Sequence, residues 1–359
     1  MKITFPYMGN SHIAISFFLS GLGHEVIYPP VPTKKTLSLG VQYSPEFACL
    51  PFKILLGTYL EAVEAGADTI ATSGGYGPCR AGYYGELHKR ILHDMGFPIR
   101  MIVLEPPLKG PLDFYNKLNS LIRPQSSWRH FCRVFKIAWQ KLKAMDEIED
   151  KLHQLRPLAF VPREMTIAYE KGLSYIEQAQ TLAQVMEASD EALAGMKKVS
   201  VDPTRNPLKI GLIGEIYVVL EPSANHDIEK ILGEMGVLVH RSIFLTNWTR
   251  DNTLVNREKD VRQAAMPYIN QLIGGHGQNS AGETVRYAEH GFNGVIQLAP
   301  FTCIPEIVAK SIMPAISLDK GIPVMTVFLD EQTGRTGIET RLEAFVDLLQ
   351  ERRRQQEAS

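Results

Sequence analysis

The sequence predicts an α/β protein built from two Rossmann-like, doubly wound lobes. Short apolar patterns typical of strands alternate with helical patterns, the same order recurs in the second half, and a segment without strand patterns separates the halves. We expect a first lobe over residues 1–112, a helical insertion over residues 113–205 and a second lobe over residues 206–359. The recurrence indicates that the lobes arose by internal duplication.

The first lobe alternates strands and helices from its start. Prolines 29, 30 and 32 predict an irregular loop between its second strand and the next helix. Strands are expected at residues 2–5, 25–28, 69–72 and 96–105, and helices at residues 12–22, 46–65 and 83–95.

The second lobe repeats this order, with strands expected at residues 209–213, 237–240, 291–303 and 321–330. The spacing of two matching features supports the duplication. Gly66 precedes Cys79 by 13 positions, and Gly291 precedes Cys303 by 12.

The insertion is nearly free of glycine over residues 114–198, and its aromatic residues recur at helical spacing. Cys132 lies among these aromatics and is expected to be a core thiol. A second helix is expected over residues 164–197. The insertion is also locally basic, which predicts either a solvated helix face or a docking face for an acidic partner or a phosphate-bearing ligand. The basic residues are Arg123, Arg129, Arg133, Lys136, Lys141 and Lys143.

Composition excludes several classes of protein. The chain has 359 residues, 45% of them hydrophobic, so it holds enough apolar residues for a large core. With 38 basic and 39 acidic side chains it lacks the basic excess of a nucleic-acid-binding protein. No run of 18 apolar residues predicts a membrane span, and the first 20 residues lack a convincing leader pattern, so we expect a cytoplasmic protein.

Three of the four cysteines are candidate ligands. Cys79 and Cys303 follow matching strands, where ligands bind in open α/β sheets, and Cys49 begins a predicted helix. A proline lies next to or near each of them, as in Cys49-Leu-Pro, Pro-Cys79 and Cys303-Ile-Pro. Three thiolates suit an iron–sulfur cluster or a zinc ion, for which His276 or His88 would supply a fourth ligand. Because no Cys-x-x-Cys pair is present, inert thiols, a cluster and zinc all remain open on spacing alone.

Two glycine-rich turns and a polar tail are weaker candidates. Ser73-Gly-Gly-Tyr-Gly77 and Gly274-Gly-His-Gly277 could present backbone amides to an anion, although neither matches a phosphate-binding motif and backbone geometry explains the glycines equally well. Glu215 and Tyr217 follow the first strand of the second lobe. In the tail, Thr340 and Glu343 predict a capping box at a helix start. Four charged residues near it could bind a ligand or form internal ion pairs: Asp330, Glu331, Arg335 and Arg341.

Four segments together resemble the 2-hydroxyacyl-CoA dehydratase superfamily, and most of all its poorly characterised CoA-enzyme-activase-related branch. They are Ser73-Gly-Gly-Tyr-Gly-Pro-Cys-Arg-Ala-Gly-Tyr-Tyr-Gly85, Gly274-Gly-His-Gly-Gln-Asn-Ser280, Leu298-Ala-Pro-Phe-Thr-Cys-Ile-Pro-Glu306 and Asp330-Glu-Gln-Thr-Gly334. The resemblance covers nearly the whole chain except its helical middle.

The resemblance implies that Cys49, Cys79 and Cys303 hold an iron–sulfur cluster between two lobes, a [4Fe–4S] cluster or alternatively a double-cubane [8Fe–9S] cluster. It also implies an ATP-dependent activator of the actin/sugar-kinase fold, carrying its own [4Fe–4S] cluster, as the electron donor. The chain is then expected to be a reductase or dehydratase-like component acting at an open iron. The alternative is a non-catalytic cluster-holding or electron-relay subunit. Such a chain would assemble with copies of itself or with a larger homologous subunit. Neither a substrate nor a catalytic residue transfers.

Overall fold

The computed structural model describes residues 1–75, 78–105, 110–122, 126–253 and 259–358. Of the residues named above, Tyr76, Gly77 and Arg123 lie outside these ranges. Within them the chain forms an α/β fold with two four-stranded sheets, and every strand pairing is parallel.

The two sheets have the same strand order. In the first sheet the order is β2-β1-β3-β4, and in the second it is β6-β5-β7-β8. The first sheet consists of β1 (Lys2–Thr4), β2 (Glu25–Val26), β3 (Thr69–Ser73) and β4 (Arg100–Leu104). The second consists of β5 (Lys209–Gly214), β6 (Leu238–Arg241), β7 (Gly294–Pro300) and β8 (Val324–Leu329). All the predicted strands are therefore present, each with bounds within a few residues of its predicted range.

Helices connect the strands of each sheet. Around the first sheet they are α1 (Ser11–Gly21), α2 (Lys34–Tyr43), α3 (Leu50–Glu64), the 3-10 turn η1 (Arg80–Tyr83), α4 (Tyr84–Asp94) and α5 (Pro111–Ile122). Around the second they are α9 (Ile216–Leu220), α10 (Pro222–Asn225), α11 (Ile228–Glu234), α12 (Leu245–Thr253), α13 (Lys259–Ala265), α14 (Gly277–Glu289), α15 (Ile304–Lys320) and α16 (Arg335–Glu357).

The helix predicted over residues 46–65 starts later, at Leu50, and a further helix, α2, precedes it. The prolines before α2 predicted an irregular loop, so this helix was not expected. It begins after Thr33, which forms a capping box with Thr36. Helices α2 and α3 cross at two glycines. A Cβ on Gly40 would lie 1.7 Å from the carbonyl oxygen of Lys53, so only glycine permits this approach.

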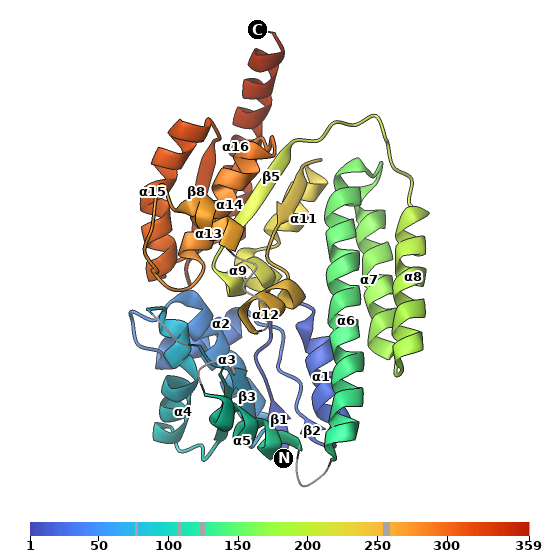
Figure 1. The fold of residues 1–359 in the computed structure, drawn as a ribbon, viewed down its shortest axis with the longest axis vertical. Coiled ribbons are helices and arrows are strands. Elements are labelled where there is room, and N and C mark those ends of the chain that lie inside the picture. The colour runs from blue at the N-terminus through green and yellow to red at the C-terminus, as the bar shows by residue number, and fades with distance from the viewer. Residues whose placement is uncertain (76–77, 106–109, 123–125, 254–258, 359) are drawn as a thin grey trace.

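A helical layer lies between the two sheets in sequence and beside both of them in space (Figure 1). It consists of α6 (Trp128–Leu155), the short η2 (Arg156–Leu158), α7 (Pro162–Gln178) and α8 (Leu182–Lys197). The prediction of a single helix over residues 164–197 is wrong. This segment forms two helices, because Thr181 makes a capping box with Gln184 and starts the second one.

Lys141 explains how the helical layer holds together. Its side chain is fully buried, and its ammonium donates hydrogen bonds to the carbonyls of Ile176 and Glu177, at 2.7 and 2.8 Å. These carbonyls belong to the last turn of α7, where backbone acceptors lack helical partners. Lys141 thus joins α6 to α7 and is not part of a solvated basic face.

The two sheets meet at the carboxyl ends of their strands. The loop after β1 contacts the segment after β5, where the amide of Gly9 donates a 2.6 Å hydrogen bond to Glu221. The buried Lys53 on α3 forms a 3.0 Å ion pair with Glu331, which follows β8 and remains exposed. Loops at the ligand-binding edge of each sheet therefore face each other. No helix in the described part of the chain is long and apolar enough to span a membrane.

Candidate functional site

The three cysteines predicted as ligands each stand at the start of a helix. Cys49 is the N-cap of α3, Cys79 the N-cap of η1 and Cys303 the N-cap of α15. Each has an extended backbone with φ of −73°. A helix N-terminus carries unpaired amide donors and a partial positive charge, so all three sulfurs lie where an anionic ligand set is favoured.

Hydrogen bonds join the three cysteine loops. The guanidinium of Arg80 donates to the carbonyl of Phe47 at 2.7 Å and to the carbonyl of Thr302 at 2.5 Å. The hydroxyl of Thr302 donates to the same Phe47 carbonyl at 3.1 Å. Thr302 has a φ of +65°, which is uncommon for a β-branched residue. The structure thus brings together all three predicted loops, from both sheets.

The glycine-rich turn at Gly274 closes over Cys79. A Cβ on Gly274 would lie 2.6 Å from the backbone nitrogen of Cys79, and one on Gly275 would lie 3.6 Å from its sulfur and 3.0 Å from Pro305. Both glycines have positive φ, of 80° and 49°. Their role is therefore close backbone approach, the geometric alternative given for the glycine-rich turns.

Burial keeps the three thiols protonated in the absence of a cation. Cys49 is 7% exposed and Cys303 is 5% exposed, whereas Cys79 is half-buried. Loss of hydration raises the pKa of Cys49 to about 11, although its sulfur is hydrogen-bonded to the hydroxyl of Tyr84. Loss of hydration also raises the pKa values of Cys79 and Cys303. Such thiols become ligands only when a metal compensates the thiolate charge.

Two acidic side chains lie beside the thiols. Glu215 accepts a hydrogen bond from the amide of Val218 at 3.1 Å, and burial raises its pKa to about 7. Its charge raises the pKa of each of the three cysteines. Tyr217, the other residue noted in this turn, is buried, and its hydroxyl has no hydrogen-bond partner among the described residues.

Glu306 is the second acid of the site, and sequence analysis missed it. It is fully buried in the first turn of α15, three positions after Cys303. Its carboxylate accepts hydrogen bonds from the hydroxyl of Ser280 and from the amide of Gln297, at 3.0 and 2.8 Å. Burial raises its pKa to about 7. An acid in the first turn of a mostly apolar helix was the available signal, but it also fits ordinary stabilisation of the helix dipole.

The three sulfurs can be compared with the requirements of a single zinc ion. A mononuclear tetrahedral zinc site, with Zn–S bonds of about 2.3 Å, places its sulfurs about 3.8 Å apart. Among the described residues, the three cysteine sulfurs are not all within 4.8 Å of one another.

The two histidines considered for zinc differ in their surroundings. His88 is fully buried, stacks on Phe52 and is hydrogen-bonded through Nε2 to the Phe52 carbonyl at 3.1 Å. Burial lowers its pKa to about 3, so it is a neutral core side chain. His276 accepts a 2.9 Å hydrogen bond at Nε2 from the indole of Trp248.

Cys132 is exposed, so its predicted place in the core is wrong. The buried face of α6 carries Val134, Ala138 and Lys141, and Cys132 lies on the opposite side of the helix. The neighbouring aromatics do stack on one another, but Phe135 remains 48% exposed. Helical spacing identified an aromatic stripe without showing which face of the helix the rest of the molecule covers.

The polar tail forms ion pairs. Arg335 pairs with Asp227 at 3.0 Å and with Glu339 at 2.8 Å, and Glu331 pairs with Lys53. Asp330 accepts a hydrogen bond from the Thr333 hydroxyl within its own turn. The predicted capping box at Thr340 is wrong, because α16 already begins at Arg335.

We compared the chain with known protein families and with curated proteins. No family model matches it, and no curated protein matches it significantly.

Proposed function

We propose that the chain is an iron–sulfur protein in which Cys49, Cys79 and Cys303 hold the cluster. The observation that carries the proposal is the set of three helix-capping thiols in loops that Arg80 and Thr302 join at the facing edges of two sheets. A purely structural role for the thiols gives no reason for cysteine to recur at three joined N-caps.

The donor set and its surroundings fit such a group. Soft thiolates suit iron–sulfur chemistry, and the amides of Ala81 and Glu306 donate hydrogen bonds to Cys79 and Cys303. When bound, a [4Fe–4S] cluster supplies low-potential one-electron chemistry, and three protein thiolates leave one iron open. A double-cubane [8Fe–9S] cluster is the alternative form.

The surrounding residues have separate tasks in this proposal. Arg80 holds the loops in register and places a positive charge beside an anionic site. Glu215 and Glu306, with pKa values raised to about 7, hold protons on their carboxyl oxygens near neutral pH. The Tyr84 hydroxyl is hydrogen-bonded to the Cys49 sulfur and orients it.

The wider assignment follows from the resemblance. We propose a reductase or dehydratase-like component that an ATP-dependent [4Fe–4S] activator reduces, in a homo-oligomer or beside a larger homologous subunit. The shared strand order supports the proposed duplication, since Cys79 follows β3 and Cys303 follows β7, the third strand of each sheet in chain order. The domain limits at residues 112 and 205 belong to the same proposal.

The test is metal analysis of protein purified without oxygen. The wild-type chain should carry about four irons and four sulfides for a [4Fe–4S] cluster, or about eight irons for the double cubane. Cys79→Ala and Cys303→Ala should each lose most of the iron. Cys132→Ala is the matched control, because this thiol is exposed on α6 and should leave the iron content unchanged.

Two results would contradict the proposal. Zinc without sulfide would identify a different metal site, and full iron retention in both ligand variants would show that these thiols do not hold it. A cluster-bearing chain that restores activity only when mixed with a larger partner would identify the electron-relay subunit instead of the catalytic component.

A further inference from the structure

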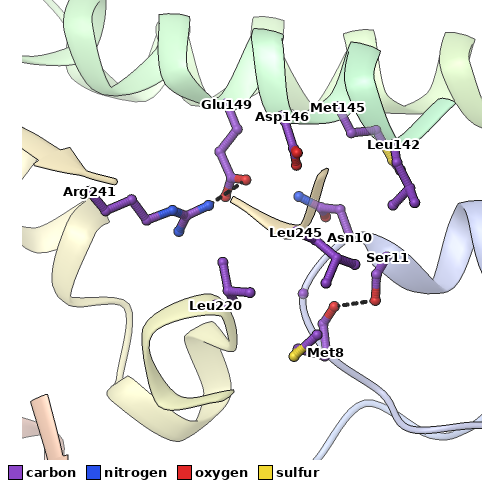
Figure 2. A pocket seen from close by; sticks show the side chains of 11 residues that line it. Met8, Asn10, Ser11, Leu142, Met145, Asp146, Glu149, Leu220, Arg241 and Leu245 are labelled. Carbon is purple, nitrogen blue, oxygen red and sulfur yellow. Dashed lines mark hydrogen bonds and ion pairs between the residues drawn. The ribbon is translucent and has the colours of Figure 1, made fainter. Parts of the chain in front are cut away.

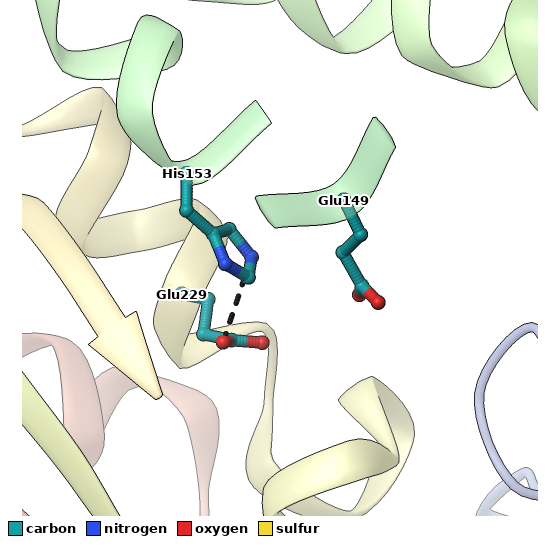
Figure 3. A group of neighbouring side chains, drawn as sticks. All are labelled: Glu149, His153 and Glu229. Atoms are coloured by element: carbon teal, nitrogen blue, oxygen red, sulfur yellow. Dashed lines mark ion pairs between the residues drawn. The ribbon is translucent and has the colours of Figure 1, made fainter. Parts of the chain in front are cut away.

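A second group of ligand-type side chains lies far from the cysteine loops in the chain, where the helical layer meets the second sheet (Figure 3). It consists of Glu149 and His153 on α6 and Glu229 on α11. One candidate ligand atom from each residue lies within 4.8 Å of the other two. The group is independent of the function proposed above.

The sequence places two of these ligands on one helix face. Glu149 and His153 are four residues apart in α6, so their side chains project from adjacent turns in the same direction. Glu229, in the first turn of α11, approaches from the other side. An imidazole nitrogen with two carboxylate oxygens is a donor set that divalent Mn, Fe and Zn ions accept.

Two buried atoms of this group lack hydrogen-bond partners. His153 is 6% exposed and Glu229 is 9% exposed. Neither His153 Nδ1 nor Glu229 Oε1 has a hydrogen-bond partner among the described residues, and the nearest ring nitrogen to Oε1 is His153 Nε2, in a long ion-pair contact of 3.5 Å. Buried polar atoms are almost always hydrogen-bonded, so a buried carboxylate oxygen that has only this long contact and no hydrogen bond points to a missing ligand between the two side chains.

Arg241 fixes the carboxylates without using all their oxygens. Its guanidinium contacts Oε2 of Glu149 and Oε2 of Glu229, each at 2.7 Å. Arg241 thus binds one oxygen of each carboxylate. Contacts of this kind, made to a metal ligand by a residue that does not itself bind the metal, fix the orientation of the ligand.

The local charge also favours an added cation. Three acids face this region, Asp146, Glu149 and Glu229, against the two guanidiniums of Arg241 and Arg156.

A small cavity adjoins the group. It has a volume of about 30 Å³, and Glu149, Asp146 and Arg241 line it together with Asn10 (Figure 2). This space is large enough for a water molecule. It therefore provides room beside Glu149 for a further oxygen ligand.

We propose that Glu149, His153 and Glu229 bind one divalent transition-metal ion, which joins the helical layer to the second sheet. The ion takes the ring nitrogen of His153 and one oxygen from each carboxylate. The ligand set has no thiolate, so the site is chemically distinct from the cysteine loops.

Mn²⁺ is the probe that separates the two sites, since it prefers oxygen and nitrogen ligands to thiolates. Chelator-treated full-length protein is titrated with Mn²⁺, and free Mn²⁺ is counted by its EPR signal. We expect one bound Mn²⁺ per chain, both in the wild type and in a Cys49→Ser/Cys79→Ser/Cys303→Ser variant. His153→Gln and Glu149→Gln should each weaken binding at least tenfold.

His24→Gln is the matched control, because His24 is also buried and its Nδ1 is also unpaired in the described structure. It should bind Mn²⁺ as the wild type does. Circular dichroism shows whether each variant is folded. If His153→Gln does not fold, Glu149→Gln provides the test, because the Glu149 side chain is 18% exposed and its substitution should be better tolerated. The proposal is overturned if the folded wild type binds no Mn²⁺, or if binding is unchanged in the folded variants. Binding lost only in the triple cysteine variant would also overturn it and would assign the metal to the thiols.

Discussion

Arg80 and the glycines around it show how single residues set the geometry of the cysteine site. Arg80 satisfies carbonyls from two other loops, and Gly274 lets a third segment approach the backbone of Cys79. None of these residues is itself a candidate ligand. They act by fixing the backbones that carry the sulfurs.

Gly274→Ala should disturb the site. Its φ of +80° and the 2.6 Å approach to the Cys79 nitrogen leave no room for a Cβ, so we expect a loss of about 1–3 kcal/mol in the free energy of unfolding. Gly195→Ala is the control. Gly195 lies in α8 with open space around it, so alanine should stabilise the protein by about 0.5–1 kcal/mol. Urea denaturation measures both, and equal effects would contradict the close-approach argument.

Titration of the single residue Glu306 should make the stability of the protein depend on pH. Its pKa in the folded chain is about 7, above the ordinary value of 4.5, so the folded state holds the proton more tightly than the unfolded state. The stability of the metal-free protein should therefore fall as pH rises from about 4.5 through 7, by an amount on the order of 3 kcal/mol from this group.

Glu306→Gln isolates that contribution, because glutamine resembles the protonated acid and does not titrate. The difference in unfolding free energy between the variant and the wild type, measured at pH 5 and at pH 8, should favour the variant more at pH 8. A difference that does not change with pH would show that Glu306 does not titrate in this range.

At the scale of elements, helix ends and helix crossings decide where chemistry is placed. All three site cysteines are N-caps, and α3, which Cys49 caps, is buried along most of its length. The crossing of α2 over α3 depends on Gly40 and Gly57, each of which lies against the backbone of the other helix. The position of the Cys49 loop therefore depends on a contact made well inside the lobe.

Gly57→Ala tests this crossing. A Cβ there would lie 1.9 Å from the carbonyl oxygen of Thr36, so the two helices must separate. We expect a loss of more than about 2 kcal/mol in the free energy of unfolding, with a lower iron content through displacement of Cys49. Thermal unfolding and iron analysis measure the two effects. Unchanged stability would show that the helices do not cross as closely as described.

The whole molecule depends on the contact between the helical layer and the second sheet. Arg241 at the end of β6 binds Glu149 of the layer and Glu229 of α11, and all three side chains are largely shielded from water. The backbone amide of Thr246 also donates to Asp146 on α6, at 3.0 Å. A buried ionic group of this kind specifies how α6 is seated on the second sheet.

Arg241→Ala should be strongly destabilising. It leaves two buried carboxylates without their cation, which costs about 3–5 kcal/mol. Arg335→Ala is the control, because Arg335 also contacts two acids but its side chain is 51% exposed. We expect it to lower the free energy of unfolding by less than about 1 kcal/mol. Chemical denaturation compares the two, and hydrogen exchange should show faster opening of α6 in the first variant only. Similar losses in both would contradict the assignment of a buried network.

Local patterns in the sequence were enough to predict the α/β class, the strands of both halves and the helical segment between them. These features depend on apolar periodicity, which a single segment displays by itself. The same patterns placed Cys49, Cys79 and Cys303 at loop-to-helix junctions, where the structure has them.

Only the tertiary structure decided which residues meet. Cys132 has the spacing of a core residue, yet its exposure depends on which face of α6 its neighbours cover. The joining of three loops by Arg80, the buried acid Glu306 and the Glu149–His153–Glu229 group each combine segments distant in the chain. Burial and long-range contact are properties of the assembled chain, because water is excluded only once the packed elements have come together.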